Sequence, residues 1–285
     1  MKDFFRKNRL FFGVAVVLLL VSFFVKIVFS KENWSGSIVY EGMTGVKEFL
    51  NSLGGNTILN YFIVGFLIVL AIIILATLFT KISDSNSEMS DVKKLSLVGI
   101  FSALAYIFMF FGIPFILPFL KVEISVVIII LVMSFVDYKS GILIALIISV
   151  LDFLVKGSAV GYPIDQFAYF IAAFFFITPI FFIKRKTKTN KGIAVGLITS
   201  TLITTVIMVI LNYIWILPVY IKLYGLDSIT QYANAVDVNL GSANQEFIWV
   251  AVTFGAFNLV KWGIVAVIGY ISLRTTGPLI KSLSK

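Results

Sequence analysis

Eight apolar runs divide this chain of 285 residues, and they constrain its fold more than any other feature. A helix needs about 20 mostly apolar residues to cross the hydrocarbon core of a bilayer. By length and flanking charge we predict membrane-spanning helices at residues 10–29, 58–79, 95–113, 124–136, 141–155, 163–183, 192–217 and 247–273. The runs at 124–136 and 141–155 are short for spans, so their boundaries are the least well defined.

The composition agrees with a membrane protein. Hydrophobic residues make up 60% of the chain and charged residues 13%, whereas a soluble domain has about 45–50% and 25%. The net charge of +9 does not indicate a nucleic-acid partner, because the basic residues lie in short segments between the apolar runs and form no binding stripe. We therefore predict an all-α integral membrane protein.

The basic segments also predict a topology. Most of the 23 basic residues fall in alternate segments, at 1–9, 80–94, 137–140, 184–191 and 274–285. Cytoplasmic loops carry such an excess, so we expect a multi-pass protein of the cell membrane with both termini in the cytoplasm. The basic start and first apolar run have no convincing small-residue cleavage site, so we interpret them as a retained helix and not as a signal peptide.

A polar segment at residues 83–91 divides the chain into two parts. Residues 1–91 are predicted to form an N-terminal extension with two transmembrane helices, an external loop and a cytoplasmic linker. Residues 92–285 are predicted to form a six-helix membrane domain.

The chain lacks the usual side chains of catalysis and metal binding. It has no cysteine and no histidine, which excludes thiol chemistry, disulfides, imidazole general bases and the usual zinc ligands. A phosphate-cradling Gly-x-x-x-x-Gly-Lys loop and a cluster of close carboxylates are also missing from the sequence. We therefore expect neither an enzyme nor a metal or cofactor site.

Polar residues inside the last two runs point to a binding role. Asn258 and Lys261 lie near the middle of the last run, three residues apart and thus on one helical face. A charged side chain at this depth costs about 2.5–3.5 kcal/mol on insertion scales. The two residues look like polar groups inside an apolar cavity. Asn212, in the run before, has the same interpretation, or it bonds a neighbouring helix.

The segment 111–125 cannot be a continuous helix, because Pro114 and Pro118 remove backbone donors and fix φ. An apolar non-helical segment at membrane depth survives when it is buried or lines a cavity. We expect it to fold over a pocket with Phe115 and Phe119 as its apolar face. Glu123 has three possible roles: a ligand acceptor, a partner of Lys121, or an interfacial residue.

Three further pairs have local interpretations. Gly99 and Ala103, four residues apart, allow a close helix approach, either within the chain or by a partner. Asp152 and Lys156 are expected to pair along one helix. Asp165 and Gln166 begin a run, where we favour helix capping.

Four motifs in order resemble a known family. They are Phe101-Ser-Ala-Leu-Ala-Tyr, Pro114-Phe-x-x-Pro-Phe-Leu-Lys-Val-Glu-Ile-Ser, Leu211-Asn-Tyr-x-x-x-x-Pro-Val-Tyr and Phe257-Asn-Leu-Val-Lys-Trp-Gly. With the span pattern they resemble the substrate-binding S component of energy-coupling factor (ECF) vitamin transporters, most closely the riboflavin type. The resemblance covers about residues 93–273.

The resemblance implies a six-helix bundle, here preceded by two additional helices, that binds riboflavin or a related flavin from outside. It implies docking onto a transmembrane coupling subunit, the T component, driven by two ABC-type ATPases. Gly99 and Ala103 fall on the docking helix. The flavin-site residues that it implies are Asn258, Lys261, Asn212 and Glu123, which stands where the family usually has an aspartate. Together with Phe115, Phe119 and Tyr213 they form the predicted substrate site.

Two departures leave the ligand open. The family often has a Lys-Asn pair where this chain has Ile148-Ser149, and an asparagine where it has Tyr169. The ligand could therefore differ in its tail. Alternatives are an S component for another vitamin, such as thiamin or biotin, and an accessory membrane subunit for flavin delivery or redox assembly.

Overall fold

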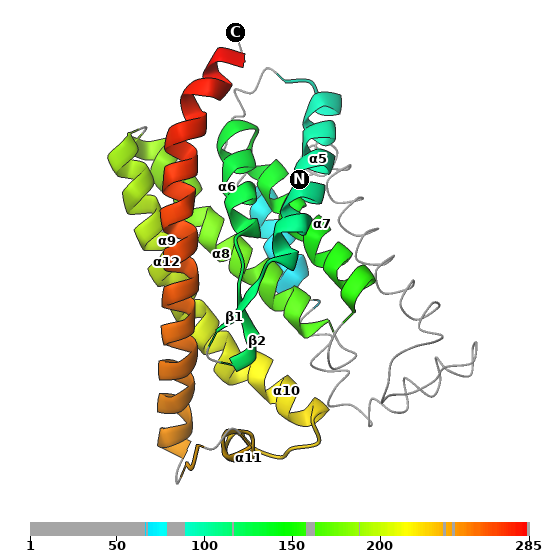
Figure 1. Ribbon diagram of the computed structural model, residues 1–285, viewed down its shortest axis with the longest axis vertical. Helices are drawn as coiled ribbons and strands as arrows, with labels where there is room; N and C mark the ends of the chain where they lie inside the picture. The colour runs from blue at the N-terminus through cyan, green and yellow to red at the C-terminus, as the bar shows by residue number, and fades with distance from the viewer. Residues whose placement is uncertain are drawn as a thin grey trace, which may run out of the picture.

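The apolar runs after residue 91 form helices in the computed structural model, which describes residues 66, 68–78, 89–115, 117–157, 163–187, 189–235, 238–240 and 243–283. A two-stranded hairpin interrupts the helices near the start (Figure 1). In chain order the elements are α5 (Asp91–Phe110), β1 (Ile113–Phe115), β2 (Leu117–Val122), α6 (Ser125–Phe135), α7 (Tyr138–Lys156), α8 (Ile164–Thr187), α9 (Asn190–Leu211), η1 (Asn212–Ile216), α10 (Leu217–Leu223), α11 (Ile229–Asn234) and α12 (Ala243–Leu283).

Five segments of the described chain are long and apolar enough to cross a membrane, as a multi-pass protein requires. They are Asp91–Phe110, Tyr138–Lys156, Ile164–Thr187, Asn190–Lys222 and Gln245–Thr276. α6 is short, as predicted, with 11 residues. α7 is longer than the predicted run at 141–155, because its helix of 19 residues begins at Tyr138 and includes Lys156. The predicted span at 10–29 lies outside the described residues.

Local chemistry sets the helix ends. The Ser90 side chain accepts a hydrogen bond from the Lys93 amide and caps α5, and the Asp137 carboxylate caps α7 by accepting from the Ser140 amide. Gly157 ends α7 with φ of 73°, a conformation that favours glycine.

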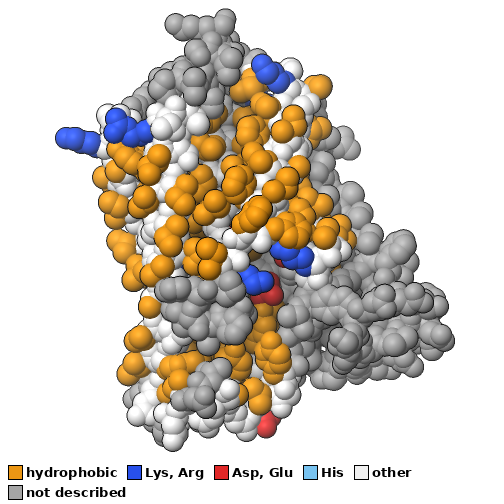
Figure 2. Space-filling view, viewed as in Figure 1, with side chains coloured by type: hydrophobic (Ala, Val, Ile, Leu, Met, Phe, Trp, Pro, Cys, Tyr) orange, Lys and Arg blue, Asp and Glu red, His pale blue; other side chains and the backbone are white. Residues whose placement is uncertain are grey.

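The bundle has two chemically different ends. The junctions α6–α7 and α8–α9 and the start of α5 lie at one end, which we name the basic end because it carries Lys94, Lys139, Lys184, Arg185 and Lys186. The hairpin lies toward the opposite end, with α10 and α11 beyond it (Figure 1); we name this the hairpin end. Figure 2 shows a broad hydrophobic face between them, with a small group of basic and acidic side chains at mid-height.

The main core lies among α6, α7, α8 and the inner faces of α9 and α12. Its largest fully buried side chains include Trp262, Phe170 and Phe176. Helices approach closely at glycines: a Cβ on Gly196 of α9 would lie 3.2 Å from the Ile180 Cα of α8. Such contacts are typical of helix packing in lipid, where dispersion between close surfaces replaces the hydrophobic effect.

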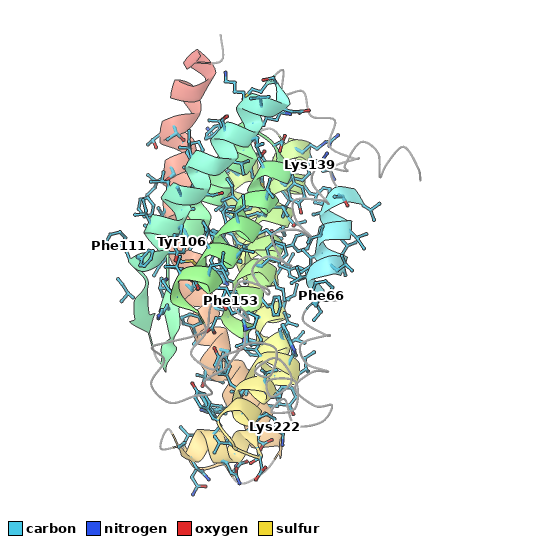
Figure 3. All side chains as sticks on the ribbon, turned by 90° about the vertical axis from the view of Figure 1, so that its right-hand side faces the viewer. Phe66, Tyr106, Phe111, Lys139, Phe153 and Lys222 are labelled. Atoms are coloured by element: carbon cyan, nitrogen blue, oxygen red, sulfur yellow. The ribbon has the colours of Figure 1, made fainter. Side chains whose placement is uncertain are left out.

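A short helix of the N-terminal extension, Ile68–Leu78, belongs to the same core. Its Val69, Ile72 and Ile73 are almost fully buried. Figure 3 shows this helix, with Phe66 at one end, on the side of the bundle away from Tyr106 and Phe111. This helix therefore packs on a different side of the bundle from Tyr106 of α5.

The proline-containing segment forms an antiparallel hairpin, in which Ile113 pairs with Val122 and Pro114 with Lys121. The prediction that it is not helical is confirmed; its strand character was not predicted. A second hydrophobic cluster, around Leu217, Ile221 and Phe254, joins α10 and α11 to the outer part of α12.

Candidate functional site

The ammonium of Lys261 is paired with a carboxylate from a distant part of the sequence. Its Nζ lies 3.2 Å from Oε1 of Glu123, and each side chain is 12% exposed. Glu123 directly follows β2, so the pair joins the hairpin to the middle of α12. The partner is therefore Lys261, and Lys121, which the sequence suggested, is exposed.

Aromatic rings surround the same ammonium. The Lys261 Nζ lies 5.5 Å from the Trp262 ring and 5.9 Å from the Phe257 ring. Cation–π contacts at such distances stabilise a charge that has left water, by about 0.5–2 kcal/mol each. The ammonium thus lies among aromatic side chains with the Glu123 carboxylate beside it.

Asn258 is 3% exposed and bonded within its own helix. Its Nδ2 donates to the Phe254 carbonyl at 2.8 Å, and its Oδ1 accepts from the Trp262 indole N–H at 3.0 Å. Trp262 in turn stacks on Phe176 of α8, with ring centroids 4.6 Å apart. Asn258 therefore orients the tryptophan that fixes α12 against α8.

Asn212 lies at the junction of α9 and the π-helical turn η1. It is 5% exposed, and its Nδ2 donates to the Met208 carbonyl one turn back at 2.7 Å. The sequence suggested a bond to a neighbouring helix, and the structure places this bond within the same helix. π-helical turns often occur at functional sites. Within the described residues, no hydrogen bond links Asn212 to Asn258 or Lys261.

Three other residues of the predicted site, one tyrosine and two phenylalanines, belong to segments toward the hairpin end. Tyr213 packs edge-on against Phe247 at 5.2 Å, in the second hydrophobic cluster, which also includes Val122 of β2. Phe115 lies in β1 and Phe119 in β2. The side chains of these two phenylalanines lie outside the described part, so their expected role as an apolar face stays a prediction.

The positions where this chain departs from the family motif have local partners. Ile148 is fully buried, and the Ser149 hydroxyl donates to the Ala145 carbonyl of its own helix. The Tyr169 hydroxyl lies 2.9 Å from the Ser125 hydroxyl at the start of α6, two residues after Glu123. Tyr169 therefore places a polar group near the hairpin side of the ion pair.

The expected caps of α8 have longer-range partners. Asp165 accepts a hydrogen bond from the Tyr220 hydroxyl of α10. The Gln166 Nε2 donates to Asp152 Oδ2 at 2.8 Å and to the Gly157 carbonyl at 3.1 Å. The structure thus uses both residues to join elements. The expected Asp152–Lys156 pair is confirmed, with a separation of 2.9 Å.

The small residues of α5 face outward. Gly99 and Ala103 are both exposed, and a Cβ on Gly99 would meet no atom within 4 Å. Their face of α5 also exposes Leu95 and Ile107. Within the described residues, Gly99 and Ala103 therefore do not form a helix contact inside the chain, which was one of the two roles predicted for them.

The arrangement is suited to binding. The described residues include no group of three or more His, Cys, Asp or Glu side chains that could hold a metal ion. The predicted residues supply an ammonium, a carboxylate, two carboxamides and aromatic rings, which are the kinds of group that can bind a flat, polar-edged molecule. The fold and site define a multi-pass membrane protein with a buried polar site below a hairpin.

Comparison with known proteins identifies the group. The family model for the substrate-specific component of ECF transporters matches residues 93–273. The chain belongs to this family, and it is therefore a transport component and not an enzyme.

Three relatives indicate how similar the chain is to individual proteins. The riboflavin transporter FmnP of Bacillus subtilis (strain 168) is 38% identical over 45% of this chain and 69% of its own length. The riboflavin transporter RibU of Streptococcus thermophilus (strain ATCC BAA-250 / LMG 18311) is 32% identical over 50% of this chain and 68% of its own length. RibU of Staphylococcus aureus (strain TCH60) is 26% identical over 69% of this chain and 96% of its own length.

A solved structure agrees on the fold. The S component described in "Structure and mechanism of the S component of a bacterial ECF transporter" superposes with a TM-score of 0.54 and 24% identity. The match covers 67% of this chain and 99% of the other. About two thirds of the chain thus has the S-component fold.

Proposed function

We propose that this chain is the riboflavin-binding S component of an ECF-type vitamin uptake transporter. The observation that carries the proposal is the partly buried Lys261–Glu123 pair, which joins the hairpin to α12. The similarity to transporters named for riboflavin supports this ligand over the alternatives thiamin and biotin.

The chemistry of a flavin fits these groups. Its ring has carbonyl and imide groups along one edge, and an ammonium has three N–H donors, so Lys261 can keep Glu123 and still donate to a ring carbonyl. Asn258 and Asn212 add amide groups near the middle of the bundle. Aromatic side chains such as Tyr213 supply flat apolar surface for the ring.

The hairpin is proposed as the cover of the site. Its strands carry Phe115 and Phe119, and Glu123 at its end is held by Lys261. Opening the hairpin requires this ion pair to separate or to rearrange, so ligand entry and the ion pair are linked.

We further propose that the exposed face of α5 docks onto a T component driven by two ABC-type ATPases. Gly99 and Ala103 would allow a partner helix to approach closely, as small residues do in lipid. The helix Ile68–Leu78 lies on the side away from Tyr106 and Phe111 (Figure 3), so this helix does not cover that part of α5.

The basic end is proposed to face the cytoplasm, with both termini on that side, because cytoplasmic loops carry excess Lys and Arg. The two-part organisation, with residues 1–91 as an extension and 92–285 as the binding domain, is proposed as well. The hairpin end then faces outward, where a vitamin arrives.

Titration of the detergent-purified chain with riboflavin, thiamin and biotin tests the ligand. We expect riboflavin to bind with quenching of its fluorescence and to be displaced by neither other vitamin. An accessory subunit for flavin delivery or redox assembly would not hold flavin when purified alone, and that result would overturn the proposal.

A matched pair of substitutions tests the docking face. Gly99→Leu and Gly263→Leu both enlarge a glycine whose added Cβ would meet no atom within 4 Å, on α5 and α12 respectively. We expect both variants to bind riboflavin, and we expect Gly99→Leu alone to lose co-purification of the T component. Co-purification that survives Gly99→Leu places the docking face elsewhere.

A further inference from the structure

A second polar cluster joins three helices toward the hairpin end. Its centre is Asp152 of α7, which accepts from the Gln166 Nε2 of α8 at 2.8 Å and lies 2.9 Å from the Lys156 ammonium. That ammonium lies 4.4 Å from the Phe110 ring and 5.9 Å from the Tyr106 ring, both on α5. The charges of the cluster are therefore balanced internally.

Two polar side-chain atoms beside this cluster have no hydrogen-bond partner. The Tyr106 hydroxyl and the Gln166 Oε1 are both buried without a hydrogen-bond partner. Gln166 is only 5% exposed, and its Nε2 is held by Asp152 and the Gly157 carbonyl, which fixes the direction of Oε1. Buried polar atoms are rarely unpaired in native proteins, so these two require an explanation.

The cluster is adjacent to the proposed flavin site. Gln166 and Tyr169 are three residues apart on α8, so their side chains lie on one face within about one turn. The Tyr169 hydroxyl meets Ser125, which is two residues from Glu123. Polar groups thus continue from the Lys261–Glu123 pair along α8 to Gln166.

The unpaired atoms select a particular chemistry. Gln166 Oε1 is an acceptor and needs a donor; the ring carbonyls cannot donate, and the one imide N–H of the ring lies on the edge that we assign to Lys261. A hydroxyl group can donate to Gln166 and also accept from, or donate to, the Tyr106 hydroxyl. A chain of hydroxyl groups satisfies both atoms.

We propose that Tyr106 and Gln166 bind the polyhydroxyl chain of the flavin, while the Lys261 region binds its ring. This inference rests on the proposed function. Asp152 is then a positioning residue, because it acts by holding the Gln166 side chain. The alternative is that the cluster only joins α5, α7 and α8.

The test compares riboflavin with lumiflavin, which has the same ring with a methyl group in place of the hydroxyl chain. We expect Tyr106→Phe and Gln166→Met, in the full-length chain in detergent, to weaken riboflavin binding about three- to tenfold each, as loss of one hydrogen bond does. Lumiflavin affinity should stay the same. Tyr106→Phe removes an unpaired hydroxyl, so the thermal stability of the ligand-free protein should not fall.

Tyr138→Phe is the matched control. The Tyr138 hydroxyl bonds Thr178 at 2.8 Å near the basic end, so its loss should lower stability and leave the ratio of the two affinities unchanged. If Tyr106→Phe and Gln166→Met change both affinities equally, or neither, the cluster is only structural. Equal wild-type affinities also overturn the inference while the proposed function stands. A wild-type protein that binds neither flavin overturns the proposed function itself.

Discussion

Two of the lysine–carboxylate pairs in the described residues have similar lengths and different character. Lys156 and Asp152 are 2.9 Å apart, one turn apart on one helix, with side chains 35% and 12% exposed. Lys261 and Glu123 are 3.2 Å apart, come from elements far apart in sequence, and are both 12% exposed. The first pair stabilises a helix end. The second holds the end of the hairpin against α12, and we therefore propose the role in ligand binding for this pair.

Removing the long-range pair should have the largest effect. Lys261→Met leaves Glu123 buried without its counter-ion and removes the donor to the flavin ring. Losing a hydrogen bond from a charged group costs about 1.5–3 kcal/mol, or roughly 10- to 100-fold in affinity. Fluorescence titration with riboflavin measures this, and an unchanged affinity would remove Lys261 from the site.

Exchanging the charges separates binding from stability. The double variant Glu123→Lys with Lys261→Glu restores an ion pair, so its melting temperature should exceed that of Lys261→Glu alone. Its riboflavin affinity should remain at least about tenfold below wild type, because a carboxylate now faces the ring carbonyls. Full recovery of binding would mean that the pair is only structural.

A smaller effect is expected at the local pair. Asp152→Asn keeps an oxygen that can accept from Gln166 but removes the charge opposite Lys156. We expect riboflavin affinity to fall less than about threefold, with lumiflavin unaffected. A loss as large as that of Lys261→Met would contradict the division of roles between the two pairs.

Lys156→Gln should have the smallest effect. Its side chain is about one-third exposed, and such pairs contribute about 0–1 kcal/mol. The cation–π contact with Phe110 adds little at an accessible position. Thermal unfolding in detergent should shift by a few degrees at most, and riboflavin affinity should not change. A large change in affinity would show that the ligand contacts this ammonium.

The sequence predicted the parts of this structure that depend on local patterns. Apolar runs placed the helices from residue 95 onward, but α12 extends to Leu283, well past the predicted end at residue 273. The two prolines predicted the break that became the hairpin. The i, i+4 pair of Asp152 and Lys156 could also be predicted from the sequence, because helical periodicity alone brings the two side chains together.

Long-range contacts could not be read from the same patterns. Glu123 meets Lys261, and Gln166 reaches back to Asp152, because helix packing and the hairpin bring these segments together. Helical spacing places Asn258 and Trp262 side by side, because four residues separate them on one helix, but spacing alone does not show that the indole N–H donates to the Asn258 side chain. The π turn at Asn212 has no sequence signature that we used.

The most direct test of the account is the absorbance spectrum of the full-length protein purified in detergent from cells. We predict flavin absorbance that remains with the wild-type protein and is lost with Lys261→Met, while both proteins elute as folded species. A folded wild-type protein that carries no flavin, and that does not quench added riboflavin, would contradict the account.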